Sequence, residues 1–196
     1  MISPGYIKTR LNKLGETNSS SIGETNSSSK GYTAAGVLLI LFERDGEHWI
    51  ILNKRTQKVE HHKGEICFPG GRKDILDKDL TETALRETWE EMGVQPNDVS
   101  VLGVLETTQT TTGYEITPTV AWISHPYQFD IENDEVEEII EIPLAVLFSR
   151  CARRDEAKLL AGQVVNQPAY QYGGNLVFGA TARILNNFAD TISERN

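Results

Sequence analysis

The stretch 68–94 constrains the fold of this chain more than any other, because it specifies a loop, a helix start and a helix end in one short segment. A Gly-Gly pair at 70–71 closes an apolar run and opens a polar loop. Asp79 then stands as a candidate N-cap, with Glu82 three residues later, which is the spacing of a capping box. Gly93 suits the left-handed position that follows a helix. The sequence therefore predicts a helix between Asp79 and Gly93.

Three glutamates of this helix gather on one side. At about 3.6 residues per turn, Glu87, Glu90 and Glu91 lie within an arc of roughly 100°. Like charges this close destabilise a helix unless a cation lies between them, and carboxylate ligands suit Mg²⁺ or Mn²⁺. Arg86 precedes the three acids and can hold one carboxylate in a bidentate pair. We therefore predict a divalent-cation site with these glutamates as ligands, and the alternative is a solvated acidic helix face.

The arrangement resembles the Nudix box, the Gly-x5-Glu-x7-Arg-Glu-apolar-x-Glu-Glu-x-Gly-apolar signature of the Nudix hydrolases. The positions that match are Gly71, Arg86, Glu87, Glu90, Glu91, Gly93 and Val94. The sequence departs from the signature in three ways: Asp77 stands at the usual first Glu, one extra residue separates it from Arg86, and Thr88 replaces an apolar residue. The resemblance implies the Nudix fold, an α/β fold in which a mixed β-sheet forms an α/β/α sandwich with the metal helix beside it.

The sequences that flank the box are similar to the coenzyme A diphosphatases within this superfamily. That family carries an upstream pattern ending in Phe-Pro-Gly-Gly and a downstream pattern Tyr-x-Tyr-Gly-Gly-x5-Gly-Ala-Thr-Ala-Arg-Ile-Leu. The upstream pattern is echoed by residues 51–56, Glu60, His62, 64–66 and 68–71, and the downstream one by Tyr170, 172–174 and 179–185. The likeness spans residues 32–192 and implies coenzyme A as the substrate.

Two upstream positions depart from the coenzyme A diphosphatase pattern. Glu60 stands where the family has Arg, and Glu65 replaces Gln. The first change reverses a charge, and the second replaces an amide donor with a group that only accepts when ionised. Coenzyme A carries a diphosphate and a 3′-phosphate, so both changes weaken the expected fit to this anion.

The chemistry that the resemblance implies is metal-assisted hydrolysis of a nucleoside diphosphate-linked metabolite. For coenzyme A the products would be 4′-phosphopantetheine and adenosine 3′,5′-bisphosphate. The expected catalytic residues are Arg86, Glu90 and Glu138. Glu138 is the candidate for a further metal ligand or for the general base, and Glu90 is the alternative base. Strand alternation puts Glu138 on the side of Val136 and Ile140, where an acid is costly unless it is paired or metal-bound. The alternative for Glu138 is a solvated loop.

Substrate contacts are expected from Arg55, His62 and Arg72. The two arginines stand at motif positions and would contact phosphates, while His62 would hold its loop or touch the substrate; a surface role is the alternative for each. Two other functions remain open: a Nudix diphosphatase for ADP-ribose, NADH or dinucleoside polyphosphates, and a non-catalytic nucleotide-binding module. The three glutamates speak against the second, because a sensor does not need converging carboxylates.

Charge and apolar content limit the classes of partner. A net charge of −9 argues against nucleic-acid binding, which needs a basic surface. The longest apolar run, 34–42, is too short to cross a membrane. Two cysteines imply no disulfide framework and fit a reduced cytoplasm. The expected partner is a small-molecule nucleoside diphosphate in the cytoplasm, with no nucleic acid and no membrane, and a homodimer remains open.

The first thirty residues differ in composition from the rest. Residues 15–29 hold the polar heptapeptide GETNSSS twice, and such short polar repeats cannot bury a core. We predict a flexible arm over 1–30, the alternative being a segment ordered by a partner subunit, and a Nudix hydrolase domain over 31–196.

Three further segments of this domain have a clear pattern. The apolar runs 34–42 and 48–53 predict two strands joined at a tight turn. Alternation over 113–124 predicts another strand, which Pro118 should confine to an edge or a bulge. The spacing of apolar residues over 180–192 predicts an amphipathic helix.

Overall fold

The computed structural model describes residues 2–19, 31–58, 62–131, 134–160 and 162–193. The two longest apolar runs form β1 (Thr33–Arg44) and β2 (Glu47–Arg55), which pair antiparallel with Ile40 opposite Ile51. Asp45 and Gly46 join them in a turn with positive φ angles of 55° and 79°. These strands confirm the expectation for 34–42 and 48–53.

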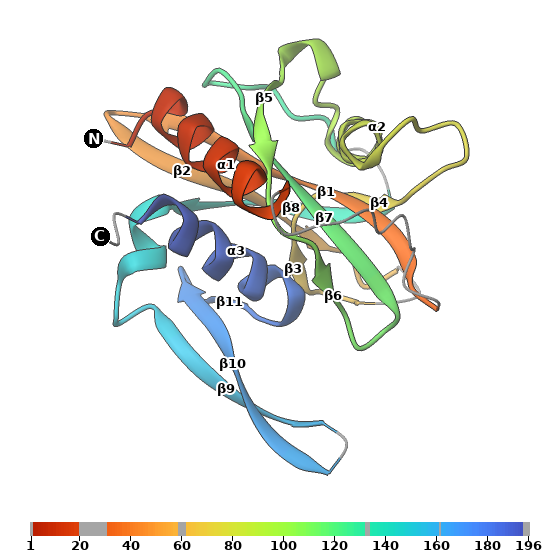
Figure 1. The fold of residues 1–196 in the computed structure, drawn as a ribbon, viewed down its shortest axis with the longest axis vertical. Coiled ribbons are helices and arrows are strands. Elements are labelled where there is room, and N and C mark those ends of the chain that lie inside the picture. Colours follow the sequence, from red (N-terminus) through yellow and green to blue (C-terminus); the bar gives the residue numbers. More distant parts are fainter. Residues whose placement is uncertain (1, 20–30, 59–61, 132–133, 161, 194–196) are drawn as a thin grey trace.

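The main sheet has eight strands and mixed directions (Figure 1). The remaining strands are β3 (Ile66–Cys67), β4 (Gly70–Arg72), β5 (Ser100–Val104), β6 (Thr108–Gln109), β7 (Tyr114–Trp122) and β8 (Val136–Pro143). The central path runs β3-β2-β1-β7-β5, while β4 pairs with β1, β6 with β7 and β8 with β2. Only the β1–β7 pair among these described strands is parallel, so the predicted mixed sheet is confirmed.

Pro118 lies in the interior of this sheet and not at an edge, but the pairing beside it is irregular, which agrees with the alternative of a bulge. Its strand β7 runs between β1 and β5. The β5 ladder ends at the pair Val104–Thr119, and the β6 ladder begins at Thr108–Ile116. Pro118 therefore falls in the gap between the two ladders, where its carbonyl still accepts a hydrogen bond from the Leu105 amide. A missing N–H is tolerated there because no partner strand requires it.

Helices cover both faces of the sheet (Figure 1). On one face α2 (Leu80–Met92) packs Ala84 and Met92 against Leu38 and Ile40 of β1. On the other face α3 (Gly179–Ile192) joins a larger cluster that includes the alternate residues of β1. Both clusters are buried, which confirms the α/β/α sandwich and the predicted C-terminal helix. Two short 3-10 turns, η1 (Pro96–Asp98) and η2 (Leu144–Phe148), connect other elements.

A second, three-stranded sheet has the order β11-β10-β9. Its strands are β9 (Arg153–Leu160), β10 (Gln163–Tyr172) and β11 (Asn175–Val177). The β9–β10 hairpin extends away from the main body, whereas the base of β10 packs on α3 (Figure 1). No helix in the described parts of the chain is long and apolar enough to cross a membrane.

Residues near the N-terminus form a docked helix rather than a flexible arm. Helix α1 (Pro4–Ser19) buries Ile7 and Leu11, one turn apart, in the cluster beneath α3. Arg10 donates from Nε to the Thr191 carbonyl at 2.8 Å and from Nη2 to the Ser193 carbonyl at 2.9 Å, which places a cation at the carboxyl end of α3. The expectation of an arm is therefore wrong for residues 4–19, while residues 20–30, with the second GETNSSS copy, lie outside the described residues.

We expect Ile7→Ala to lower the free energy of unfolding by about 2–4 kcal/mol, because the side chain is fully buried and its removal leaves a cavity. Lys8→Ala, at an exposed position on the same helix, is the control and should change it by less than about 0.5 kcal/mol. Urea unfolding followed by circular dichroism measures both variants. Equal stabilities of the two would show that α1 does not contribute to the core.

Candidate active site

Both ends of α2 are fixed as the sequence predicts. The Asp79 side chain accepts a hydrogen bond from the Glu82 amide at 2.9 Å, and the Glu82 carboxylate accepts one from the Lys78 amide at 2.6 Å. At the other end Gly93 adopts φ 70°, and its amide donates to the Trp89 carbonyl at 2.9 Å. These caps satisfy backbone groups that would otherwise lack partners, so the helix presents its acids in one defined rotation.

The Gly-Gly pair at 70–71 touches two of the three predicted metal ligands. The Gly70 amide donates to Glu91 Oε2 at 3.1 Å, and Asn53 Nδ2 donates to the same oxygen at 3.0 Å. A Cβ on Gly71 would lie 2.5 Å from the Glu87 carboxylate. Any larger residue at position 71 would therefore displace Glu87 from its place beside the sheet.

Burial and mutual repulsion act on these carboxyl groups. Burial raises the pKa of Glu91 to about 7, with a smaller contribution from the charges of Glu135 and Glu87; the Gly70 amide and Arg55 act in the opposite direction. Burial also raises the pKa of Glu87, against the lowering effect of Arg86. Acids with raised pKa values beside one another are a common property of functional sites, and they favour a bound cation.

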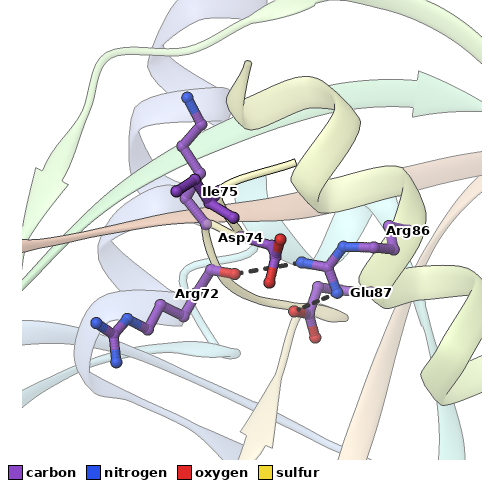
Figure 2. A pocket seen from close by; sticks show the side chains of 6 residues that line it. Arg72, Asp74, Ile75, Arg86 and Glu87 are labelled. Carbon is purple, nitrogen blue, oxygen red and sulfur yellow. Dashed lines mark hydrogen bonds and ion pairs between the residues drawn. The ribbon is translucent and has the colours of Figure 1, made fainter. Parts of the chain in front are cut away.

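Arg86 links the helix to the preceding loop. Its Nε and Nη2 donate to the two carboxylate oxygens of Asp77, both at 3.0 Å. Its Nη1 lies 2.9 Å from Glu87 Oε1 and 3.1 Å from Glu90 Oε2, and Nη2 also donates to the Arg72 carbonyl at 3.3 Å (Figure 2). Arg86 thus forms its bidentate pair with Asp77, the residue that departs from the Nudix signature, and not with a glutamate of the helix.

The carboxylates of Glu87, Glu90 and Glu91 are suitable ligands for a divalent cation, although their oxygens do not converge on one point. Across the described residues, no three His, Cys, Asp or Glu side chains converge at metal-binding distances. Glu87 and Glu90 are drawn to Arg86, whereas Glu91 is hydrogen-bonded to Asn53. Burial raises the pKa values of Glu87 and Glu91, so a neighbouring cation would stabilise their ionised forms. Ligation by the three glutamates stays a prediction.

The three predicted substrate-binding residues lie in three different surroundings. Arg72 shares a pocket of about 710 Å³ with Glu87 and Arg86 (Figure 2). Arg55 lies deeper, with Nη1 3.6 Å from Glu91 and Nη2 3.4 Å from Glu135, and its buried Nε has no hydrogen-bond partner among the described residues. The exposed His62 instead contacts Glu65, Nδ1 to Oε2, at 2.9 Å.

Glu135, and not Glu138, is brought to the acid cluster. Glu138 lies in β8, so the solvated-loop alternative does not apply, but its side chain is exposed. It pairs with Lys54 and lies two residues before Ile140, on the same face of the strand. Ile140 packs on the α3 side of the sheet. The charge of Glu135 raises the pKa of both Glu87 and Glu91. Simple alternation puts Glu135 on the face opposite Ile140, where it lies, but the sequence does not show that this face, which includes Ile139, points toward α2.

The fold and the site together place a capped acidic helix beside a glycine loop on a mixed sheet, an arrangement that suits the hydrolysis of phosphate compounds. The NUDIX domain family matches residues 32–160 of the chain. An uncharacterized Nudix hydrolase, NudL, from Pectobacterium atrosepticum is 36% identical over 148 residues, which cover 74% of this chain and 76% of that protein. The peroxisomal coenzyme A diphosphatase NUDT7 of Mus musculus is 38% identical over 108 residues, 55% of this chain and 46% of the mouse protein.

A solved structure has the same architecture over nearly all of the chain. The MutT/nudix family protein from Enterococcus faecalis covers 98% of this chain and 75% of its own, with a TM-score of 0.54 and 13% sequence identity. This protein belongs to the Nudix hydrolase family. It is a hydrolase that acts on the pyrophosphate bond of nucleoside diphosphate-linked substrates, and enzymes of this family generally use divalent metal ions.

We expect Glu87→Gln and Glu91→Gln each to lower kcat by at least about 100-fold, because each removes a charge from the predicted cation site. Glutamine keeps an acceptor oxygen for the Asn53 and Gly70 donors, so the fold should persist. Glu82→Gln, on the same helix but away from the pocket, is the matched control. Phosphate-release kinetics and near-ultraviolet circular dichroism measure the variants, and wild-type turnover in both would exclude the metal-helix assignment.

Asp77→Asn should lower the free energy of unfolding by about 2–4 kcal/mol at neutral pH, because it breaks a largely buried ion pair. Hydrogen bonds from Arg86 hold the pKa of Asp77 well below its usual value of about 4. The stabilisation is therefore complete above about pH 4 and is lost as the pH falls toward the folded pKa.

The stability difference between wild type and Asp77→Asn should accordingly narrow when denaturant unfolding is repeated near pH 3. Asp74→Asn is the control, because an amide oxygen can still accept the hydrogen bond from the Leu76 amide. A difference that is equally large at both pH values would contradict the assigned ion pair.

Proposed function

We propose that this Nudix hydrolase cleaves the diphosphate of coenzyme A to 4′-phosphopantetheine and adenosine 3′,5′-bisphosphate. The observation that carries the proposal is the pocket that Arg72 and Glu87 line together (Figure 2). The Arg72 guanidinium has no carboxylate partner among the described residues, so it is available to a phosphate. The similarity to the mouse coenzyme A diphosphatase and the flanking patterns at 51–71 and 170–185 support the choice of substrate.

Glu87, Glu90 and Glu91 would hold the cation, for which Mg²⁺ or Mn²⁺ is the best match to carboxylate ligands. When bound, such an ion neutralises phosphoryl oxygens and lowers the pKa of a coordinated water. Arg86 has a positioning role, because its contacts with Glu87 and Glu90 orient both side chains relative to the loop. Asp77 fixes Arg86 in turn.

The reaction itself requires a proton acceptor. The oxygen of a water molecule forms a bond to one phosphorus, the bridging P–O bond breaks, and the water gives a proton to a carboxylate. Glu90 and Glu135 are the candidates: Glu90 is half-exposed beside Arg86, and Glu135 faces Arg55 next to the buried glutamates. Glu138 is the weaker candidate, because it lies on the opposite side of the sheet.

A diphosphatase for ADP-ribose, NADH or dinucleoside polyphosphates is the second candidate function. It is favoured by Glu65, which replaces the family Gln and here accepts a contact from His62. The second substitution, Glu60, lies outside the described residues. Both acids would oppose binding of the 3′-phosphate that distinguishes coenzyme A from these alternatives.

A panel of diphosphates assayed with Mg²⁺ or Mn²⁺ separates these functions. We expect coenzyme A to be hydrolysed with a kcat/KM at least about tenfold above those of ADP-ribose, NADH and diadenosine tetraphosphate. Liquid chromatography should identify 4′-phosphopantetheine and adenosine 3′,5′-bisphosphate as the products. Rapid cleavage of ADP-ribose with none of coenzyme A would favour the second candidate, and no cleavage of any diphosphate would favour a binding module.

A further inference from the structure

Two aliphatic side chains beside the pocket are almost completely exposed. Ile75 is 97% and Leu76 is 86% accessible to solvent, the highest values among the large apolar residues of the described chain. Isolated exposed apolar residues are common on protein surfaces, but two adjacent ones at a catalytic pocket suggest a ligand contact.

The loop that carries these residues is held in place by hydrogen bonds. The Asp74 amide donates to Asp77 Oδ2 at 2.9 Å, and the Leu76 amide donates to Asp74 Oδ1 at 2.9 Å. The Asp77 amide in turn donates to the Asp74 carbonyl at 3.2 Å. Because Arg86 of α2 holds Asp77 by two hydrogen bonds, the loop holds Ile75 in a defined position relative to α2.

The two residues differ in what they face. Ile75 lines the same pocket as Arg72, Lys73 and Glu87, whereas Leu76 does not line it (Figure 2). The lining of the pocket thus combines one aliphatic side chain with the cations Arg72 and Lys73. This combination suits a ligand in which an apolar group is attached close to an anion.

Coenzyme A has such a group on one side of its diphosphate. On the nucleoside side the diphosphate joins a phosphorylated ribose, which is polar. On the other side a single methylene separates it from a quaternary carbon that carries two methyl groups, in the pantoyl unit. ADP-ribose has a second ribose, with hydroxyl groups, at the corresponding place.

We propose that Ile75 contacts the two methyl groups of the pantoyl unit and thereby favours coenzyme A over diphosphates that carry a sugar at this place. The inference rests on the proposed function, because it assumes that the diphosphate lies between Arg72 and Glu87. It makes Ile75 a specificity-determining residue, and it orients the substrate with the pantetheine arm toward the 73–76 loop.

The test compares Ile75→Ser with Leu76→Ser on three substrates: coenzyme A, a coenzyme A analogue without the two methyl groups, and ADP-ribose. Loss of the apolar contact should lower kcat/KM for coenzyme A about threefold to fifteenfold in Ile75→Ser. The same variant should stay within about twofold of wild type on the other two substrates. Leu76→Ser should match wild type on all three, and Ile75→Val should restore most of the loss.

The outcomes separate the inference from the function on which it rests. If wild type cleaves coenzyme A but Ile75→Ser acts equally on coenzyme A and its demethylated analogue, the contact is wrong and the function stands. If wild type cleaves ADP-ribose and not coenzyme A, the proposed function fails and the contact fails with it. Equal losses in Ile75→Ser and Leu76→Ser on every substrate would mean that both substitutions disturb the loop and that Ile75 makes no selective contact, which overturns the inference.

Discussion

The close approach of α2 to the sheet is the constraint on which the site depends. The helix can lie this near only where the sheet lacks side chains: a Cβ on Gly36 would collide with the Leu80 carbonyl, and one on Gly71 with the Glu87 carboxylate. Because the helix is pressed against β1 and β4, Glu91 is buried and Glu87 is partly buried. Their raised pKa values follow from this packing, and a bound cation would offset the cost of ionising them there.

Positive charge from the protein balances part of this acidity from two sides. Arg55 approaches from β2, near Glu91 and Glu135, while Arg86 approaches from the helix itself. Asp77 takes up two hydrogen-bonding positions of the Arg86 guanidinium, so only part of that charge remains for the glutamates. Hydrogen bonds and ion pairs within the protein therefore position the three glutamates, and Arg86 offsets only part of their negative charge.

Signals between neighbouring residues made helix α2 and its glutamates predictable. The positions of Glu135 and helix α1 depend instead on contacts between segments far apart in the sequence. The caps at Asp79 and Gly93 depend on neighbouring residues, and both were found where the pattern placed them. Glu135 was not selected, because a single strand does not show which of its faces points toward α2; Ile139 packs on the α2 side, whereas Ile140 packs on the α3 side. Helix α1 was missed because, among its described side chains, the buried apolar ones are Ile7 and Leu11, and their burial depends on a helix far away in the sequence.

The contact between α1 and α3 also brings the first and the last helix of the domain together. Tyr6 donates from its hydroxyl to the Ile192 carbonyl at 3.1 Å, next to the two hydrogen bonds from Arg10. The first and the last helix of the described chain are therefore in direct contact. Such a topology suits circular permutation, in which a short linker joins these two helices and new ends are opened at an exposed turn such as Gly173-Gly174.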